Sequence, residues 1–373
     1  MSSPAPKITK IAVYQVDLPL KEGSYKWSEG KSVQTFDATI VQVSTDIGVT
    51  GYGECCPLGP TYLPSYAEGC RVGIKTLAPS LIGKNPLELL KLNEYMDKCL
   101  KGHPYVKSPI DVACWDILGK VTKQPIVTLL GGRFGEEYNL YRAISQGTAE
   151  EMRRSVEKYQ SEGYKIFQLK VGGKIDEDIS RIKACSDILA PEELLIADAN
   201  TGWLMHEAVR VCNAVRDYSN VYIEQPCATY EENASVRKQC QLPMLMDESM
   251  DDVHVLNRII TDKSADGINL KISKVGGLTK ARMIRDLCVS VGLAMNVEDT
   301  WGSDIATAAI SHLAHSTPPR YLLMSTDFNS YVSKDTADGA PKREHGCMRA
   351  PEGPGLGIEP KMAVLGKPLF EIC

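Results

Sequence analysis

The sequence lacks the features that mark membrane, secreted and nucleic-acid-binding proteins. It has no apolar run of about 18 residues, and its start, MSSPAPKITK, has no apolar signal-peptide core. Net charge is −5 and no basic stripe occurs, so nucleic acid is not expected as a partner. None of its 12 cysteines forms a C-x-x-C pair, which favours reduced thiols. We therefore expect a soluble, cytoplasmic protein with no membrane partner.

What remains is an ordinary globular composition with room for two domains. The chain has 373 residues, 43% hydrophobic and 24% charged. Two alternating segments near the start (8–18 and 38–45) read as half-buried strands, and helical patterns follow them. We predict an α+β capping domain over 1–125 and a catalytic barrel domain over 126–350. The Gly- and Pro-rich tail, 351–373, is predicted to return to the capping domain.

The second part carries a regular series of residues that could perform chemistry. Each residue ends a short apolar run, and successive steps are 28, 26, 23 and 24 residues. Such a step suits one strand and one helix of a β/α unit, which predicts a (β/α)8-type barrel. Further strands are predicted at 139–145, 293–299 and 321–327. The five residues, all expected at the catalytic end of the barrel, are Lys170, Asp198, Glu224, Asp247 and Lys271.

The types of residue in this series indicate a divalent cation between two bases. Asp198, Glu224 and Asp247 supply oxygen ligands without His or Cys beside them, which favours Mg²⁺ over Zn²⁺. Lys170 and Lys271 come from predicted strands two and six, on opposite sides of the barrel mouth. A metal-bound substrate carboxylate would be acidified at its α-carbon, with one lysine on each face. We expect one Mg²⁺ per subunit.

These motifs resemble the mandelate racemase/muconate lactonizing enzyme group of the enolase superfamily over nearly the whole chain. The resemblance implies that the three carboxylates bind Mg²⁺ and that the two lysines are the acid/base groups. It also places Asn200 and Glu248 beside the metal ligands. The motifs that carry it are Gly53-Glu54, Ile110 to Asp116, Leu130-Gly131-Gly132, Asp198-Ala199-Asn200, Glu224-Gln225-Pro226, Asp247-Glu248, and Lys271 with Gly276-Gly277.

One departure from the family pattern indicates a particular branch of the family. The family usually has K-x-K at the end of strand two, where this chain has Gln168-Leu169-Lys170. With Tyr62 in the first domain and Asp299 and Trp301 after strand seven, this form is similar to the branch that acts on proline derivatives. We expect Tyr62, Gln168, Asp299 and Trp301 to contact the substrate, although Trp301 could equally be a packing residue.

The end of strand eight bears on the reaction. Betaine-binding members of the branch present a tryptophan there, against the quaternary ammonium. This chain has Ser325-Thr326-Asp327 instead, and a carboxylate suits an ammonium that can donate a proton. Thr326 and Asp327 are therefore expected at the substrate, with capping of the next segment as the alternative for Asp327. Asp299 is a second candidate for the amine.

The expected reaction is dehydration of cis-3-hydroxy-L-proline to Δ¹-pyrroline-2-carboxylate by a lyase. The alternative is an isomerase, a 2-epimerase of proline betaine or 4-hydroxyproline betaine, because a lysine on each face serves either reaction. A non-catalytic member should have lost a ligand or a lysine, and none is lost here. We expect a homo-oligomer that acts on a small amino-acid substrate.

Overall fold

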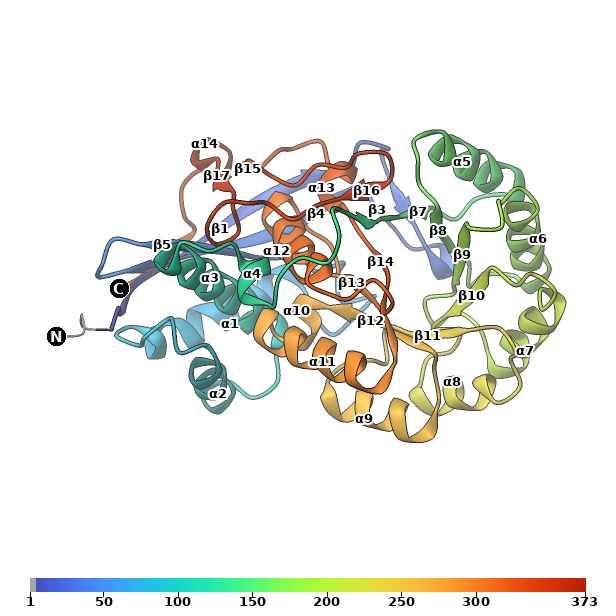
Figure 1. The fold of residues 1–373 in the computed structure, drawn as a ribbon, viewed down its shortest axis with the longest axis horizontal. Coiled ribbons are helices and arrows are strands. Elements are labelled where there is room, and N and C mark those ends of the chain that lie inside the picture. The colour runs from blue at the N-terminus through green and yellow to red at the C-terminus, as the bar shows by residue number, and fades with distance from the viewer. Residues whose placement is uncertain (1–4) are drawn as a thin grey trace.

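The structure, a computed structural model, describes residues 5–373 and has two parts that lie side by side (Figure 1). One part is a sheet with helices that holds both ends of the described chain. The other is a ring of alternating strands and helices. The first four residues of the predicted capping domain 1–125, and of the start MSSPAPKITK, lie outside the described range.

Two expectations about composition can be compared with this structure. In the described part of the chain, no helix combines the length and apolar character needed to cross a membrane. All twelve cysteines fall within the described residues, and each is a free thiol. Cys99 and Cys373 are exposed, whereas Cys347 is partly buried and the others are buried.

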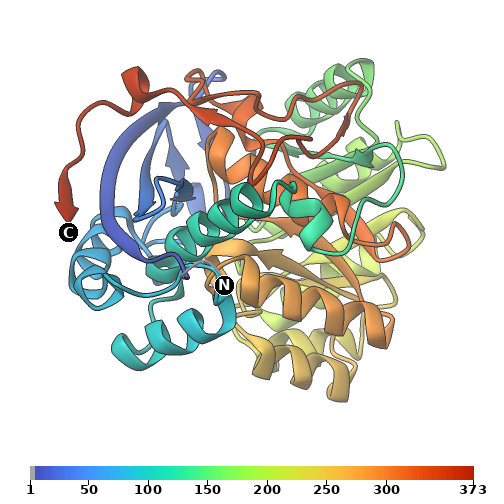
Figure 2. The same cartoon turned by 60° about the vertical axis from the view of Figure 1, so that its left-hand side comes forward.

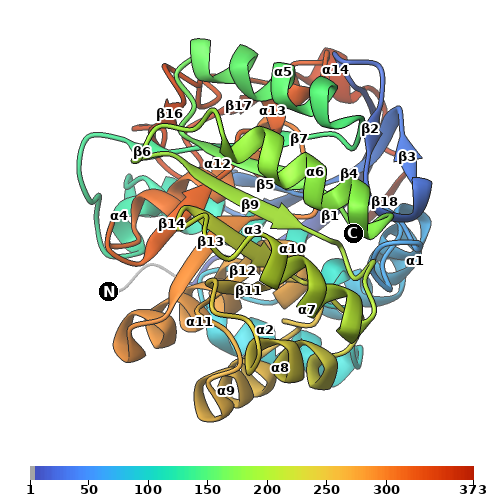
Figure 3. The same ribbon diagram turned by 90° about the vertical axis from the view of Figure 1, so that its right-hand side faces the viewer.

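Within residues 5–373, eight parallel strands form the barrel sheet, in the order β14-β13-β12-β11-β10-β9-β8-β7 (Figure 3). A parallel bridge between Leu140 and Ser325 joins its two edges, so the barrel is nearly closed and the predicted fold is confirmed. The strands are β7 (Tyr141–Ile144), β8 (Ile166–Lys170), β9 (Leu194–Asp198), β10 (Val221–Glu224), β11 (Met244–Met246), β12 (Gly267–Lys271), β13 (Ala294–Glu298) and β14 (Leu322–Ser325).

Helices alternate with these strands and cover the outside of the barrel (Figure 3). Capping boxes start two of them, with Thr148 paired to Glu151 and Thr229 paired to Glu232. The helices are α5 (Ala149–Ser161), α6 (Ile175–Ser186), α7 (Met205–Ala214), α8 (Tyr230–Arg237), α9 (Val253–Asp262), α10 (Ile272–Val275), α11 (Leu278–Val291), α12 (Asp304–His315) and α13 (Phe328–Tyr331).

The register of the parallel strands aligns the predicted chemical residues. Lys170 of β8 lies opposite Asp198 of β9, and Asp198 lies opposite Glu224 of β10. Lys271 of β12 lies opposite Glu298 of β13. Because the strands are parallel, these side chains meet at one end of the barrel, which is the end where barrel enzymes carry their sites.

The first part is built on an antiparallel sheet in the order β18-β1-β4-β5. Strand β1 (Ile8–Pro19) packs Ile11 and Val13 against the helices of this part, while Tyr14 and Val16 join the core shared with the barrel. The other strands are β4 (Thr35–Thr45), β5 (Thr50–Cys55) and β18 (Phe370–Ile372), and the helices are α1 (Ala67–Leu77), α2 (Leu89–Cys99) and α3 (Pro104–Thr122). Since β18 pairs with β1, the C-terminal tail completes the capping sheet (Figure 2).

Short elements make up the remaining connections. They include α4 (Ile126–Leu129), which follows the predicted boundary between the two domains. The others are β2 (Tyr25–Lys26), η1 (Ser28–Gly30), β3 (Ser32–Val33), η2 (Ala78–Leu81), β6 (Tyr138–Asn139), β15 (Ala337–Asp338), β16 (Cys347–Met348), β17 (Glu359–Pro360) and α14 (Met362–Leu365).

Buried carboxylates join the two parts. Glu54 of β5 accepts hydrogen bonds from the backbone N–H groups of Ser303 (2.8 Å) and Ala306 (2.9 Å) at the start of α12. Asp111 of α3 accepts from the backbone and hydroxyl of Thr279 on α11, at 2.9 and 2.6 Å. A Cβ at Gly277 would lie 2.4 Å from the Asp111 carboxylate, so the close approach requires glycine. These contacts fix the capping part over the barrel mouth.

His312 of α12 predicts an acid-sensitive step in stability. Its Nδ1 accepts from Val127 N–H at 3.1 Å, so Nε2 carries the proton that meets Leu356 O at 3.0 Å. Burial lowers the pKa of His312 to about 4, against about 6.5 in an unfolded chain. The stability that depends on neutral His312 is present above about pH 6.5 and is lost as the pH falls toward 4. By linkage, we expect a loss of about 2 kcal/mol in unfolding free energy between pH 7 and 5.

Denaturant unfolding at pH 7 and 5 tests this expectation. His312→Gln should flatten the pH dependence by that amount, since glutamine does not titrate. His206→Gln, at an exposed position on α7, is the matched control and should leave the pH dependence unchanged. An equal pH dependence in wild type and His312→Gln would contradict the assignment.

Candidate active site

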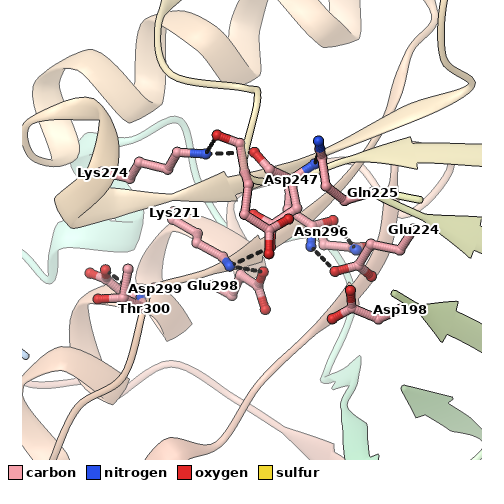
Figure 4. Close-up of polar contacts among 12 residues, drawn as sticks. Asp198, Glu224, Gln225, Asp247, Lys271, Lys274, Asn296, Glu298, Asp299 and Thr300 are labelled. Carbon is pink, nitrogen blue, oxygen red and sulfur yellow. Dashed lines mark hydrogen bonds and ion pairs between the residues drawn. The ribbon is translucent and has the colours of Figure 1, made fainter. Parts of the chain in front are cut away.

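Two buried lysines, Lys170 and Lys271, face the carboxylates at the barrel mouth, and Figure 4 shows Lys271 beside Asp247 and Glu298. Lys170 forms an ion pair with Asp198. The Lys271 ammonium lies 2.6 Å from Asp247 Oδ2 and 3.6 Å from Glu298 Oε1. Each lysine is only 6% exposed, so neither is the solvated surface charge that a lone lysine usually is.

Both lysines line one small cavity between the capping part and the barrel. Its volume is about 30 Å³, enough for only a few water molecules. Tyr25 and Trp27 cover it from one capping segment, and Tyr62 covers it from the loop between β5 and α1. A ring-sized substrate therefore needs these covering segments to move.

Tyr62 is the capping residue in closest contact with the barrel groups. Its hydroxyl lies 2.5 Å from Lys271 Nζ and 2.8 Å from Asp247 Oδ2. The predicted contact residue therefore lies between the acid/base candidate and a metal-ligand candidate.

Glu224 is held from two sides by amide groups. Gln168 Nε2 donates to its two oxygens at 3.0 and 3.1 Å, and Asn269 Nδ2 donates at 2.7 Å. Asn296 Nδ2 in turn donates to Asn269 Oδ1 at 2.5 Å. Gln168, predicted to contact substrate, lines the cavity while its amide faces Glu224. Hydrogen bonds to both carboxylate oxygens fix the orientation of the Glu224 side chain.

Sequence reasoning missed Asn269 and Asn296. A signal for Asn269 existed, because it precedes Lys271 by two residues just as Gln168 precedes Lys170. In a strand, residues two apart share a face, so both amides point inward beneath the lysines. Nothing in the local pattern distinguished Asn296 from any other polar residue of β13.

Asn200 and Glu248 lie beside the carboxylates as expected from the motifs. Asn200 N–H donates to Asp198 Oδ1 at 2.9 Å, and its side-chain amide donates to Glu248 Oε1 at 2.9 Å.

Gln225 Oε1 accepts from the backbone N–H of Asp247 at 2.9 Å. Lys274 Nζ donates to the carbonyls of Asp247 and Glu248, at 2.5 and 2.9 Å. These contacts orient the ends of β9, β10 and β11.

The donor set fits a hard divalent cation. Burial raises the pKa of Glu224 well above its ordinary value, and so does repulsion from the negative charges of Asp198 and Asp247. Asp247 Oδ1 and Glu248 Oε2 are buried and find no hydrogen-bond partner among the described residues. Clustered carboxylate oxygens with free lone pairs are the ligands that Mg²⁺ prefers.

The lysines partly stand in for that cation. Across residues 5–373, no three His, Cys, Asp or Glu side chains converge as a ready-made metal cage. Two of the three candidate carboxylates are turned toward ammonium groups instead. Burial lowers the pKa of Lys271, but Asp247, Glu298 and Glu248 outweigh it and raise that pKa above its ordinary value. A cation on the carboxylates would remove this effect and favour the neutral amine.

The predicted substrate contacts after strands seven and eight divide into two groups. Asp299 and Trp301 line the cavity, and Trp301 stacks between Phe36 and Phe328 at centroid distances of 4.1 and 4.8 Å. Thr326 and Asp327 are fully buried and are not among the described residues that line it. Trp301 therefore both packs and walls the site.

The placement of Asp327 differs from the expectation that it meets a substrate amine. Its carboxylate accepts from Tyr164 Oη at 3.1 Å and lies 3.8 Å from Arg343. These partners come from outside the cavity, so the carboxylate is already compensated by the chain itself. Thr326 Oγ1 is buried with no hydrogen-bond partner in the described part of the chain.

Comparison with known proteins agrees with this geometry. A model described as the mandelate racemase/muconate lactonizing enzyme N-terminal domain matches residues 11–131. A model described as enolase C-terminal domain-like matches residues 151–364. The chain belongs to the enolase superfamily. The resemblance seen in the motifs is thus confirmed, and the chain is an enzyme of this superfamily.

Individual relatives cover nearly the whole chain. It is 56% identical to the cis-3-hydroxy-L-proline dehydratase of Roseibium aggregatum, over 97% of this chain and 99% of the relative. It is 30% identical to the N-succinyl-L-Arg/Lys racemase of Bacillus cereus, over 95% of each. A solved structure from Roseovarius nubinhibens ISM, complexed with magnesium, is 35% identical with a TM-score of 0.96. That match covers 98% of this chain and 100% of the other.

Proposed function

We propose that this enolase-superfamily enzyme dehydrates cis-3-hydroxy-L-proline to Δ¹-pyrroline-2-carboxylate with the help of Mg²⁺. The observation that carries the proposal is the pair of buried lysines on strands β8 and β12, which face one cavity beside three carboxylates. The 56% identity to a cis-3-hydroxy-L-proline dehydratase supports the choice of substrate.

The stereochemistry of the substrate suits two facing lysines. In cis-3-hydroxy-L-proline the 3-hydroxyl and the carboxylate share a ring face, so the α-proton lies on the face opposite the leaving group. One lysine takes the α-proton, and the other gives a proton to the hydroxyl as the C3–O bond breaks and water leaves. The enamine that results moves its N–H proton to C3 and becomes the imine product.

The carboxylates would hold the metal. Asp198, Glu224 and Asp247 are the proposed ligands, and Mg²⁺ bound there would stabilise the negative charge that develops on the substrate carboxylate. Gln168 and Asn269 keep Glu224 oriented for this role. Tyr62 closes the site over Lys271 and excludes water from the reacting atoms.

Epimerisation is the second candidate, because a lysine on each face could also remove and return the α-proton. The relationship to a racemase of N-succinyl amino acids supports keeping it. Proline betaine and 4-hydroxyproline betaine would be its substrates. Ser325-Thr326 stands where a betaine site would offer an aromatic ring, which favours dehydration of the free amino acid.

Substrate preference decides between the two reactions. We expect kcat/KM for cis-3-hydroxy-L-proline to exceed that for proline betaine by at least about thirtyfold, the value of a lost cation–π contact of about 2 kcal/mol. The trans-3-hydroxy isomer is the control, since its hydroxyl and α-proton share a face and it should be dehydrated poorly. An equal or higher value for the betaine would reject the dehydratase and restore the epimerase.

A further inference from the structure

Glu298 at the end of β13 is a buried carboxylate that lines the cavity and has one oxygen without a hydrogen-bond partner in the described structure. Its Oε2 accepts from Tyr141 Oη at 2.5 Å, and the side chain is 2% exposed. Its Oε1 has no hydrogen-bond partner among the residues that the structure describes. An acidic oxygen in such a position carries a desolvation cost that a donor from a bound ligand would offset.

Lys271 does not fill this role. Its ammonium lies 3.6 Å from Glu298 Oε1, beyond hydrogen-bond distance, and is closer to Asp247 (Figure 4). It is also closer to the Tyr62 hydroxyl, at 2.5 Å. Glu298 and Asp247 therefore flank the same ammonium from neighbouring sides. A substrate whose carboxylate is held beside Asp247 would bring its α-nitrogen near Glu298, since one carbon separates the two groups.

The two other carboxylates predicted to contact the amine, Asp299 and Asp327, already have partners within the chain. Asp299 accepts the backbone N–H groups of Ser273, at 3.0 Å, and of Thr300, at 2.7 Å, together with the Ser273 hydroxyl. Asp327 accepts from Tyr164 and faces Arg343, away from the cavity. Of the three carboxylates, Glu298 alone combines a place on the cavity wall with a free acceptor in the described structure.

We propose that Glu298 accepts the ring ammonium N–H of the substrate and so determines the preference for a secondary amine over a quaternary one. The proposal rests on the proposed function, because it takes a cyclic α-amino acid as the ligand. Tyr141, from the first barrel strand, is a positioning residue that fixes the carboxylate through Oε2. Strand seven, beside the lysine, thus supplies the acceptor for a free amine, while the missing aromatic ring at the end of strand eight disfavours a quaternary one.

A pair of ring ligands tests this directly in the Mg²⁺-loaded enzyme. L-Proline carries the ring NH₂⁺, and (S)-tetrahydrofuran-2-carboxylate has an oxygen there. The Kd of the tetrahydrofuran divided by the Kd of L-proline therefore isolates the ammonium contact. Titration calorimetry on wild type and Glu298→Gln should show that ratio fall by about tenfold or more, the worth of a hydrogen bond between charged groups. Asp327→Asn is the matched control and should keep the wild-type ratio.

An unchanged ratio in Glu298→Gln, or a fall in Asp327→Asn instead, would overturn the proposal. Tyr141→Phe provides a second measurement should Glu298→Gln fail to fold. It leaves the carboxylate in place but unfixed, so the ratio should fall by a smaller factor, and no fall would also overturn the proposal. Since the readout is binding, a wild type that prefers proline yet dehydrates nothing would reject the proposed function and leave the role of Glu298 supported.

Discussion

Replacing either Lys170 or Lys271 with Met should lower the rate of dehydration by about 10²–10⁴-fold, the usual contribution of a positioned acid or base. Each lysine is buried against a carboxylate at the cavity wall, and no second lysine on the same side of the cavity can replace it in the described structure. The exposed Lys174→Met is the control and should keep the wild-type rate, because its side chain is 85% exposed.

The two variants should differ in a partial reaction. The variant that keeps the lysine facing the α-proton should still exchange that proton with D₂O, while the other should not. ¹H NMR of the substrate after incubation in D₂O measures this exchange. Complete loss of exchange in both variants would contradict a site in which one lysine serves each face.

Removing the charge of Glu224 should lower the rate of dehydration about as much as replacing either lysine. Glu224→Gln is expected to lower the rate by about 10³-fold or more, because metal stabilisation of developing charge is worth several kcal/mol. Glutamine keeps the volume of the side chain, but its amide nitrogen would face the amide donors Gln168 and Asn269. Calorimetric titration with Mg²⁺ should show weakened binding. The exposed Glu231→Gln should bind Mg²⁺ as wild type does.

Exhaustive chelation complements the variant. It should abolish turnover, and added Mg²⁺ should restore it. Turnover that survives chelation would contradict a role for the metal. Wild-type Mg²⁺ affinity in Glu224→Gln would show that Glu224 is not a metal ligand.

The barrel and its polar series were accessible from sequence because they follow from simple periods. Five successive apolar runs end in a polar residue, the steps between those residues are nearly constant, and parallel strands must bring those ends together. The alignment of Lys170 with Asp198 and of Asp198 with Glu224 is a direct consequence. The sequence predicted that the Gly- and Pro-rich tail returns to the capping domain, but not that it pairs as β18 with β1.

The substrate side of the site was harder to predict because it depends on side-chain partners distant in sequence. The place of Asp327 after strand eight predicts a contact with the amine, yet in the structure its carboxylate faces Tyr164 and Arg343 outside the cavity. Glu298 was not predicted because it stands before Asp299, and the sequence does not tell which of two adjacent carboxylates keeps a free acceptor at the cavity. Its partner Tyr141 is 157 residues away, so only the folded structure brings them together.

The most direct test of the account is a single ¹H NMR experiment on cis-3-hydroxy-L-proline in D₂O, with and without Mg²⁺. The account predicts loss of the substrate signals, appearance of Δ¹-pyrroline-2-carboxylate, and neither change after chelation. Proline, its other hydroxylated isomers and the betaines, run in parallel, would reveal α-deuterium exchange without elimination. No product from cis-3-hydroxy-L-proline, together with exchange in a betaine, would contradict the dehydratase assignment.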